Sequence, residues 1–260
     1  MKRRRNASWT TTNICSINVA NLTQDEALSF IEQLIDEDGP HYGAVVNAAK
    51  IVLANEDAEL KQALLDADVV TADGMSIVWA SRLLGHGMKQ RVTGIDLFER
   101  LVERAASLGW AVYFLGASEE SVARLTKRFK QLYPALQVAG WRNGYFDRSK
   151  SDAISAEIES SCAVLLFVAM GSPAQEHWIA SNLAATGVRF AMGVGGSFDH
   201  LSGLSRRAPM WMQRAGLEWF YRFMREPRRL WRRYLFGNAK FAILVIRQRL
   251  LSRKRPEVQY

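Results

Sequence analysis

Apolar residues along this chain follow two patterns, one typical of buried strands and one typical of amphipathic helices. Short apolar runs end at polar residues or glycines, and they lie at 43–47, 68–72, 110–116, near 136–139, at 163–170 and at 188–196. Between these runs, apolar positions recur every three to four residues, as over 97–108 and 121–132. Strands that alternate with helices predict an α/β, Rossmann-like fold, with a mostly parallel sheet covered by helices on both faces.

Local signals give several helix boundaries. Thr23 and Glu26 form a capping box that predicts a helix through about Ile35. A helical stretch is expected to run from residue 48 to Ala67, and further helices are expected to begin near Met75 and at Pro173. The run at 163–170 is apolar throughout, which predicts a strand buried on both faces.

Charge is distributed unevenly along the 260 residues. From Arg206 to Tyr260, fifteen Lys and Arg residues stand against three Asp and Glu, whereas the whole chain carries a net charge of only +8. We therefore expect a mildly acidic catalytic core over 1–205 and a basic, amphipathic helical appendage over 206–260. A basic segment rich in aromatic residues suits a membrane surface, a lipid diphosphate or a nucleic acid, and the alternative is a solvated face of a terminal helix.

Pro227 divides the appendage, because proline is disfavoured inside a helix and favoured at its first turn. One helix is expected to end near Arg225 and another to begin at Pro227. The apolar stretch 241–246 is too short to span a bilayer, and the N-terminus lacks the apolar region of a signal peptide. We expect a cytoplasmic protein, with Cys15 and Cys162 as buried free thiols.

Candidate site residues follow the predicted strands, because ligands bind beyond the carboxyl ends of parallel strands. Glycines there let backbone N–H groups approach a phosphate, although each glycine could simply form a tight turn. The polar residues expected at this rim are Asn47, Asp73, Gln175 and Asp199. Asp73 follows a buried strand and is the candidate general base, and the alternative is that it caps the helix beginning near Met75.

Several common motifs are missing from the sequence. It has no GxGxxG after the first strand, no Walker lysine motif and no GxSxG elbow. Asp66 and Asp68 resemble a metal-binding DxD motif, but they precede a strand instead of following it. The four histidines have no metal-ligand spacing. These observations favour chemistry without a metal or other cofactor.

Eight ordered blocks of sequence resemble the WecG/TagA/CpsF family, glycosyltransferase family 26, over roughly residues 14–234. The blocks are VVNAAKIV, DADVVTADGMSIV, RVTGIDLFERL, GYF, VAMGSPAQEHW, GVGGSFD, RRAP and LEWFYR with EPRRLWRRY. The resemblance implies an inverting, metal-independent hexosyltransferase that uses a UDP-sugar. The sugar would be N-acetylmannosamine, its uronic acid or a related hexose, and the acceptor an undecaprenyl-diphosphate-linked sugar in cell-surface polysaccharide synthesis.

The same resemblance implies roles for individual residues. Asp73 matches the catalytic base. Asn47 and Gln175 match residues that hold the donor sugar and the acceptor, and Arg222, Arg229 and Arg232 match arginines that complete the site. The other residues that we expect to bind substrate are Thr93, Gly94, Asp96, Gly171, Gly195 and Asp199. The three arginines belong to the appendage and would pair with a diphosphate. Val45 is a departure, because some members have a threonine there.

The expected partners are the UDP-sugar, the lipid-linked acceptor and the inner face of the cytoplasmic membrane, where the protein would be peripheral, with no nucleic acid. Self-association into homo-oligomers is left open. Two other classes compete with this interpretation. One is a non-catalytic module that binds membranes or nucleic acids, and the other is a soluble enzyme that modifies nucleotide sugars, such as an oxidoreductase or epimerase.

Overall fold

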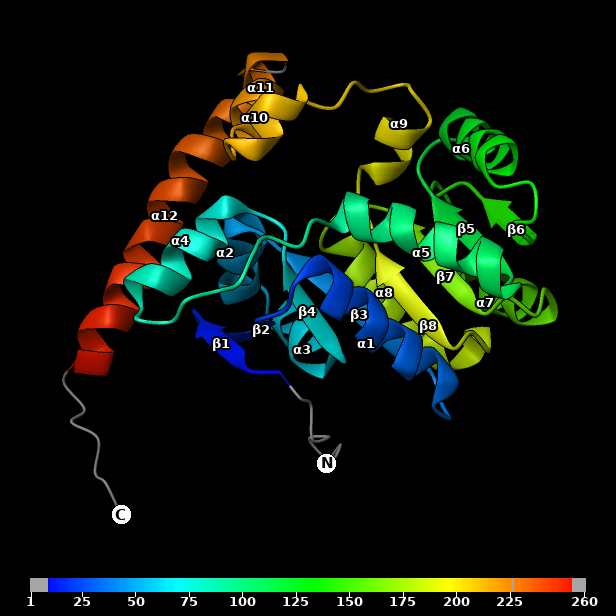
Figure 1. Ribbon diagram of the computed structural model, residues 1–260, viewed down its shortest axis with the longest axis horizontal. Helices are drawn as coiled ribbons and strands as arrows, with labels where there is room; N and C mark the ends of the chain where they lie inside the picture. Colours follow the sequence, from blue (N-terminus) through cyan, green and yellow to red (C-terminus); the bar gives the residue numbers. More distant parts are fainter. Residues whose placement is uncertain (1–8, 226, 254–260) are drawn as a thin grey trace.

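The centre of the computed structural model, which describes residues 9–225 and 227–253, is a six-stranded sheet (Figure 1). Its strands are β3 (His41–Val46), β4 (Val69–Ala72), β5 (Val112–Gly116), β6 (Val138–Arg142), β7 (Leu165–Ala169) and β8 (Phe190–Gly193). They lie in the order β4-β3-β8-β7-β5-β6, and every pairing among them is parallel. A separate antiparallel pair is formed by β1 (Thr11–Ile14) and β2 (Ile17–Ala20). The expected Rossmann-like α/β fold is confirmed.

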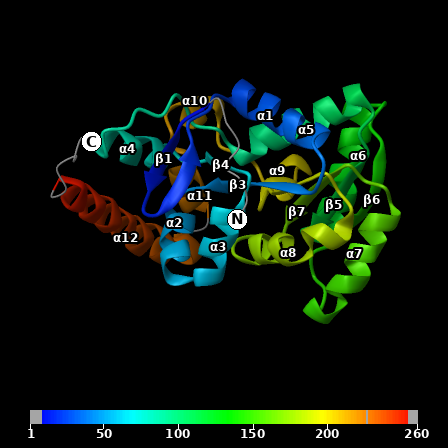
Figure 2. The same cartoon turned by 90° about the horizontal axis from the view of Figure 1, so that it is seen from below.

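Helices cover both faces of the sheet, and Figure 2 shows the two helical layers on either side of it. One layer contains α1 (Gln24–Asp36), α5 (Gly94–Leu108), α6 (Glu119–Leu132) and α9 (Ser197–Leu201). The other contains α2 (Ala48–Glu56), α3 (Ala58–Asp66), α7 (Ser151–Ser160) and α8 (Ala174–Asn182), while α4 (Met75–Leu83) lies against β1. Short 3₁₀ turns cover Arg148–Lys150 and Leu183–Thr186.

Side chains of the strands alternate between the two layers, as the pleat requires. On β5, Phe114 packs in the layer of α5, whereas Tyr113 and Leu115 pack with α7 and α8. The α5 layer has an aromatic centre, where the ring of Phe98 lies 4.5 Å from that of Phe167 between centroids. Strand β7 is buried along its whole length, as its continuous apolar run predicts.

The appendage consists of α10 (Met210–Arg214), α11 (Glu218–Arg225) and α12 (Pro227–Arg253), so the expected helix break before Pro227 is confirmed. Helix α12 packs along α2. It buries Phe241 and Val245 in the hydrophobic cluster that also contains β1, β2 and α2. The side chain of Gln248 accepts a hydrogen bond from the backbone N–H of Cys15 at 2.7 Å. The division of the chain at residue 205 stays a prediction.

Three local expectations need correction. The helical stretch 48–67 is two helices, because Asp57 ends α2 and its side chain accepts the backbone N–H of Leu60 to cap α3. The strand expected near 136–139 begins only at Val138, since the buried Leu136 closes a turn with Tyr133 instead. Cys162 is exposed, because it lies in the turn after α7, before the buried strand begins.

The sequence patterns also missed α7 and the β1–β2 pair. None of the helices in the described part of the chain has the length and apolar character that a membrane span requires.

Candidate active site

The strand order brings the candidate residues to one edge of the sheet. Strand β3 lies between β4 and β8, so the residues that follow these three strands are neighbours. Segments leave β3 and β8 toward opposite faces of the sheet, since α2 packs in one layer and α9 in the other. Such a divergence is where open α/β sheets bind ligands. Asn47, Asp73 and Gly195 all lie at this point.

Asp73 does not cap the helix that follows it. The N-cap of α4 is Gly74, and no side chain caps that helix. Instead, Asp73 Oδ1 accepts a hydrogen bond from the backbone N–H of Gly94 at 3.0 Å. Gly94 is the first residue of α5, so Asp73 supplies an acceptor to the N-terminus of a helix that begins 21 residues later in the sequence. The side chain is half-buried, and it stays accessible for a proton transfer.

Asn47 lies beside Gly74, the residue that follows Asp73. A Cβ atom built on Gly74 would lie 3.5 Å from the Cβ of Asn47. Asn47 Oδ1 accepts the backbone N–H of Lys50 at 3.0 Å and so caps α2, which uses its oxygen and leaves its amide N–H groups for other partners. Val45, two residues earlier, packs under Gly94, because a Cβ there would lie 3.2 Å from its Cγ2.

Gln175 is held in a buried polar cluster across the end of β8. Its Oε1 accepts the backbone N–H of Gly195 at 3.0 Å, and its Nε2 donates to Glu176 Oε1 at 2.8 Å. The same Glu176 oxygen accepts from Lys50 Nζ at 2.7 Å. Gln175, Glu176 and Lys50 are 2%, 3% and 6% exposed. A Cβ at position 193 would lie 2.5 Å from Gln175 Nε2, so a larger residue there would have to displace the Gln175 side chain.

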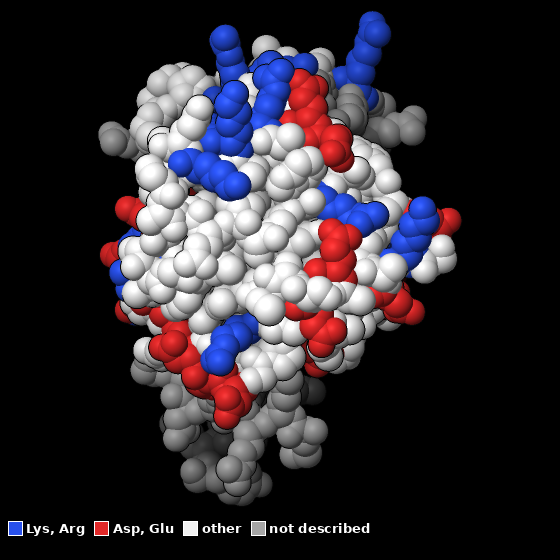
Figure 3. Space-filling view, turned by 90° about the vertical axis from the view of Figure 1, so that its right-hand side faces the viewer, with Lys and Arg blue, Asp and Glu red and all other residues white. Residues whose placement is uncertain are grey.

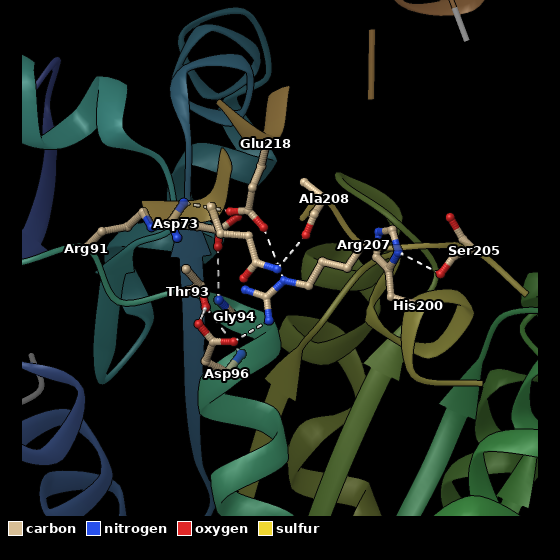
Figure 4. A network of polar contacts seen from close by, with 11 residues as sticks. Asp73, Arg91, Thr93, Gly94, Asp96, His200, Ser205, Arg207, Ala208 and Glu218 are labelled. Carbon is tan, nitrogen blue, oxygen red and sulfur yellow. Dashed lines mark hydrogen bonds and ion pairs between the residues drawn. The ribbon is translucent and has the colours of Figure 1, made fainter. Parts of the chain in front are cut away.

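The first turn of α5 begins a chain of ion pairs, shown in Figure 4. Thr93 caps this helix and donates from Oγ1 to Asp96 Oδ2 at 2.5 Å. Asp96 Oδ1 accepts from Arg207 Nη1 at 2.5 Å, and Arg207 Nε donates to Glu218 Oε1 at 3.1 Å. Glu218 Oε2 accepts from Arg91 Nη1 at 2.6 Å. These ion pairs thereby join the α/β body to α11 of the appendage.

Charge pairing dominates the electrostatics of this network. Burial alone would raise the pKa of Asp96, but hydrogen bonds from Arg207 and Thr93 and the positive charges of Arg207 and Arg91 hold it below its usual value. Burial opposes the positive charge of Arg207, yet Asp96 and Glu218 together raise the pKa of its guanidinium. Thr93 and Asp96 are therefore engaged within the protein in this state, and Asp96 is the common partner of Thr93 and Arg207.

The remaining candidates are Gly171, Asp199 and three arginines of the appendage. Gly171 follows β7 with a positive φ of 75°, and its carbonyl accepts the backbone N–H of Gln175 at 2.9 Å. Asp199 lies half-buried in α9. Arg222, Arg229 and Arg232 belong to α11 and α12, but their side chains lie outside the described residues.

Sequence reasoning missed Arg91, Arg207, Glu218, Lys50 and Glu176. All five stand inside the blocks that resemble the family, which are, in the same order, RVTGIDLFERL, RRAP, LEWFYR, VVNAAKIV and VAMGSPAQEHW. The signal was therefore present. Which members of each block touch one another depends on tertiary contacts, such as the one that spans 127 residues between Arg91 and Glu218.

The aspartate pair of the DxD-like motif lies at the opposite edge, at the amino ends of β3 and β4. Asp68 Oδ2 accepts the backbone N–H of Tyr42 at 3.0 Å, and its Oδ1 lies 3.3 Å from His41 Nδ1. Among the described residues, no group of three His, Cys, Asp or Glu side chains is placed to hold a metal ion.

Comparison with known proteins gives a consistent result. The sequence model described as the Glycosyl transferase WecG/TagA/CpsF family matches residues 12–255. A protein of Bacillus spizizenii strain W23, named N-acetylglucosaminyldiphosphoundecaprenol N-acetyl-beta-D-mannosaminyltransferase, is 31% identical over 92% of this chain and 93% of its own length. The protein of the same name from Bacillus subtilis strain 168 is 32% identical, over 91% of this chain and 90% of its own length.

Proposed function

The chain belongs to the WecG/TagA/CpsF family and is a glycosyltransferase, and from that premise we propose that its donor is a UDP-sugar and its acceptor an undecaprenyl-diphosphate-linked sugar. The transferred sugar is N-acetylmannosamine, its uronic acid or a related hexose. Both Bacillus relatives are named for transfer of N-acetylmannosamine to N-acetylglucosaminyldiphosphoundecaprenol, which makes this pair the first to test. The product would enter cell-surface polysaccharide synthesis.

The position of Asp73 carries the chemical part of the proposal. Its carboxylate accepts the Gly94 N–H, the next residue Gly74 lies beside Asn47, and Asp73 remains half-buried at the carboxyl edge of the sheet. In the proposed reaction Asp73 takes the proton of the acceptor hydroxyl while that oxygen attacks the anomeric carbon. The bond from this carbon to the UDP oxygen breaks on the opposite side, so the configuration inverts.

The leaving diphosphate needs positive partners. Arg91 and Arg207 lie on either side of Glu218 in the network next to Asp73, and guanidinium groups pair bidentately with phosphate oxygens. Backbone N–H groups at the glycine-rich turns after β7 and β8 supply further donors. We propose that these groups stabilise the charge that develops on UDP and that no metal cofactor takes part. Activity should therefore survive EDTA.

We also propose that the protein works as a peripheral protein at the inner face of the cytoplasmic membrane. Helix α12 turns Phe241 and Val245 toward the core, and on another side exposes Ile243, Ile246 and Leu250 by 64%, 52% and 56%. An apolar stripe on a basic helix suits an anionic bilayer surface. Figure 3 adds that, on the face it shows, Lys and Arg side chains gather at the top, which is the end where α9, α10 and α11 lie in Figure 1.

The decisive experiment is transfer from a panel of UDP-sugars to a synthetic N-acetylglucosaminyl-diphosphate lipid. UDP should also raise the melting temperature of the purified protein, since a ligand that binds only the native state stabilises it. Stabilisation by NAD with no response to UDP would favour the oxidoreductase class, and the absence of transfer from every UDP-sugar would contradict the proposal.

A further inference from the structure

Four charged side chains alternate in sign through the network beside Asp73. Asp96 pairs with Arg207 at 2.5 Å, Arg207 with Glu218 at 3.1 Å, and Glu218 with Arg91 at 2.6 Å. Glu218 is the member that comes from α11, and it places one carboxylate oxygen on each arginine. A single carboxylate thus bridges two guanidinium groups, in the manner of a bridging phosphate.

The coordination of Arg207 is incomplete in this arrangement. Its Nη1 donates to Asp96 and its Nε to Glu218, but its Nη2 is buried and has no hydrogen-bond partner among the described residues. A buried donor on a charged group is costly when it is unpaired. A carboxylate offers two oxygens, whereas a diphosphate group offers at least four non-bridging oxygens around two phosphorus atoms. The larger anion can therefore satisfy donors that Glu218 leaves unmet.

The Glu218 carboxylate that bridges the two arginines is also reachable from solvent and close to the proposed base, Asp73. The side chains of Arg91, Arg207 and Glu218 are 16%, 21% and 19% exposed. Arg207 is tied to the first turn of α5 through Asp96, and Asp73 is tied to the same turn through the Gly94 N–H. Figure 4 shows these side chains converging at the start of α5.

We propose that Arg91 and Arg207 form a diphosphate subsite that Glu218 occupies as an internal ligand in the substrate-free chain, and that a diphosphate displaces it. Glu218 and the diphosphate exclude each other, because both are anions that need the same two guanidinium groups. Displacement frees the first turn of α11 from the body, so binding at the site changes how the start of α11 is held. This inference rests on the proposed function for the identity of the diphosphate.

The test compares affinities at one fixed ionic strength. Glu218→Gln removes the competing charge while keeping the side-chain size, and inorganic pyrophosphate should bind this variant about tenfold tighter than the unmodified chain, as measured by calorimetry. Glu32→Gln is the matched control, since Glu32 likewise accepts two hydrogen bonds from guanidinium groups, in its case both from Arg104, outside this network. It makes the same change in net charge and should leave the affinity unchanged.

Two further ligands identify the source of the diphosphate. Tighter binding of UDP by Glu218→Gln than by the unmodified chain assigns the subsite to the donor. Tighter binding of farnesyl diphosphate assigns it to the lipid-linked acceptor. Unchanged or weaker binding of pyrophosphate by a folded Glu218→Gln chain would overturn the inference. Failure of the proposed function looks different, because the unmodified chain would then transfer no sugar while the gain for pyrophosphate persists.

A second variant and a second measurement guard against misfolding. Glu218→Asp keeps the charge but is one methylene too short to reach both arginines. We expect pyrophosphate to bind this variant about threefold tighter than the unmodified chain, and an unchanged affinity would count against the inference. In the unmodified chain, saturating pyrophosphate should speed hydrogen exchange at the start of α11. Exchange that is unchanged or slower there would show that Glu218 stays in place when the anion binds.

Discussion

The buried Lys50–Glu176 pair offers a sharp test of how the polar cluster behind Gln175 is held. Lys50 Nζ and Glu176 Oε1 are 2.7 Å apart, which corresponds to an attraction of about 6 kcal/mol at an effective dielectric constant of about 20. Removing each charge from water costs several kcal/mol, so the net contribution of the intact pair is small. Lys50→Met keeps the aliphatic stem but leaves the carboxylate of Glu176 buried without its cation.

Breaking a buried pair in this way should lower the free energy of unfolding by about 3–5 kcal/mol. For a chain of this size the melting temperature should then fall by roughly 6–20 °C. Chemical denaturation followed by circular dichroism measures the loss. Because the penalty comes from the stranded charge, Lys50→Met combined with Glu176→Gln should recover at least half of it.

Two results would refute this reasoning. A loss below about 1 kcal/mol in Lys50→Met would mean that water or another group replaces the lysine, contrary to its 6% exposure. A double variant that is less stable than Lys50→Met would mean that Glu176 contributes through something other than its charge. The exposed pair of Lys89 with Glu26 is the matched control, and Lys89→Met should change stability by less than about 1 kcal/mol.

Four further predictions follow from separate features. Asp73→Asn should lower turnover by at least about 10²-fold while UDP binding, followed by calorimetry, is retained; near-normal turnover would remove the base assignment. Because the folded-state pKa of Asp96 is held below its usual value, its stabilising effect is complete above about pH 4 and is lost as the pH falls through that lower pKa. Asp96→Asn should therefore flatten the acid limb of a plot of melting temperature against pH, and an unchanged limb would contradict this. Iodoacetamide should label the exposed Cys162 well before Cys15, whose thiol pKa is raised to about 11 by burial, as mass spectrometry of digested protein will show. Ile246→Ser should weaken binding to anionic vesicles in a co-sedimentation assay, and equal binding would exclude the apolar stripe of α12 as the contact.

The sequence predicts structural features correctly where they depend on residues that are close to one another along the chain. The capping box at Thr23 and Glu26 and the buried run of β7 appear as expected. Asn47 and Asp73 could be placed at one edge because parallel strands end together. The hydrogen-bond partner of Asp73 could not be predicted in the same way. A local rule makes Asp73 the cap of α4, whereas in the fold Asp73 accepts from the N-terminus of α5.

Ion pairs between residues far apart in the sequence could not be predicted, because they too depend on tertiary contacts. Nothing in the residues around Arg91 indicates that it meets Glu218, and nothing around Lys50 indicates Glu176, because such pairs depend on how whole helices pack. Motif blocks marked the right regions without saying which side chains touch. The basic charge of the appendage, similarly, gave no sign that α12 also completes a hydrophobic cluster.

The docking of α12 has a consequence for how the protein is made. Phe241 and Val245 close a cluster that begins with Ile14, and Gln248 bonds the backbone of Cys15 across 233 residues of chain. During translation the β1–β2 hairpin emerges well before its helical cover, because 233 residues separate Cys15 from Gln248. A nascent chain therefore carries an unfinished apolar surface on β1, β2 and α2 until α12 has been synthesised, and we expect chaperones to bind that surface in the meantime.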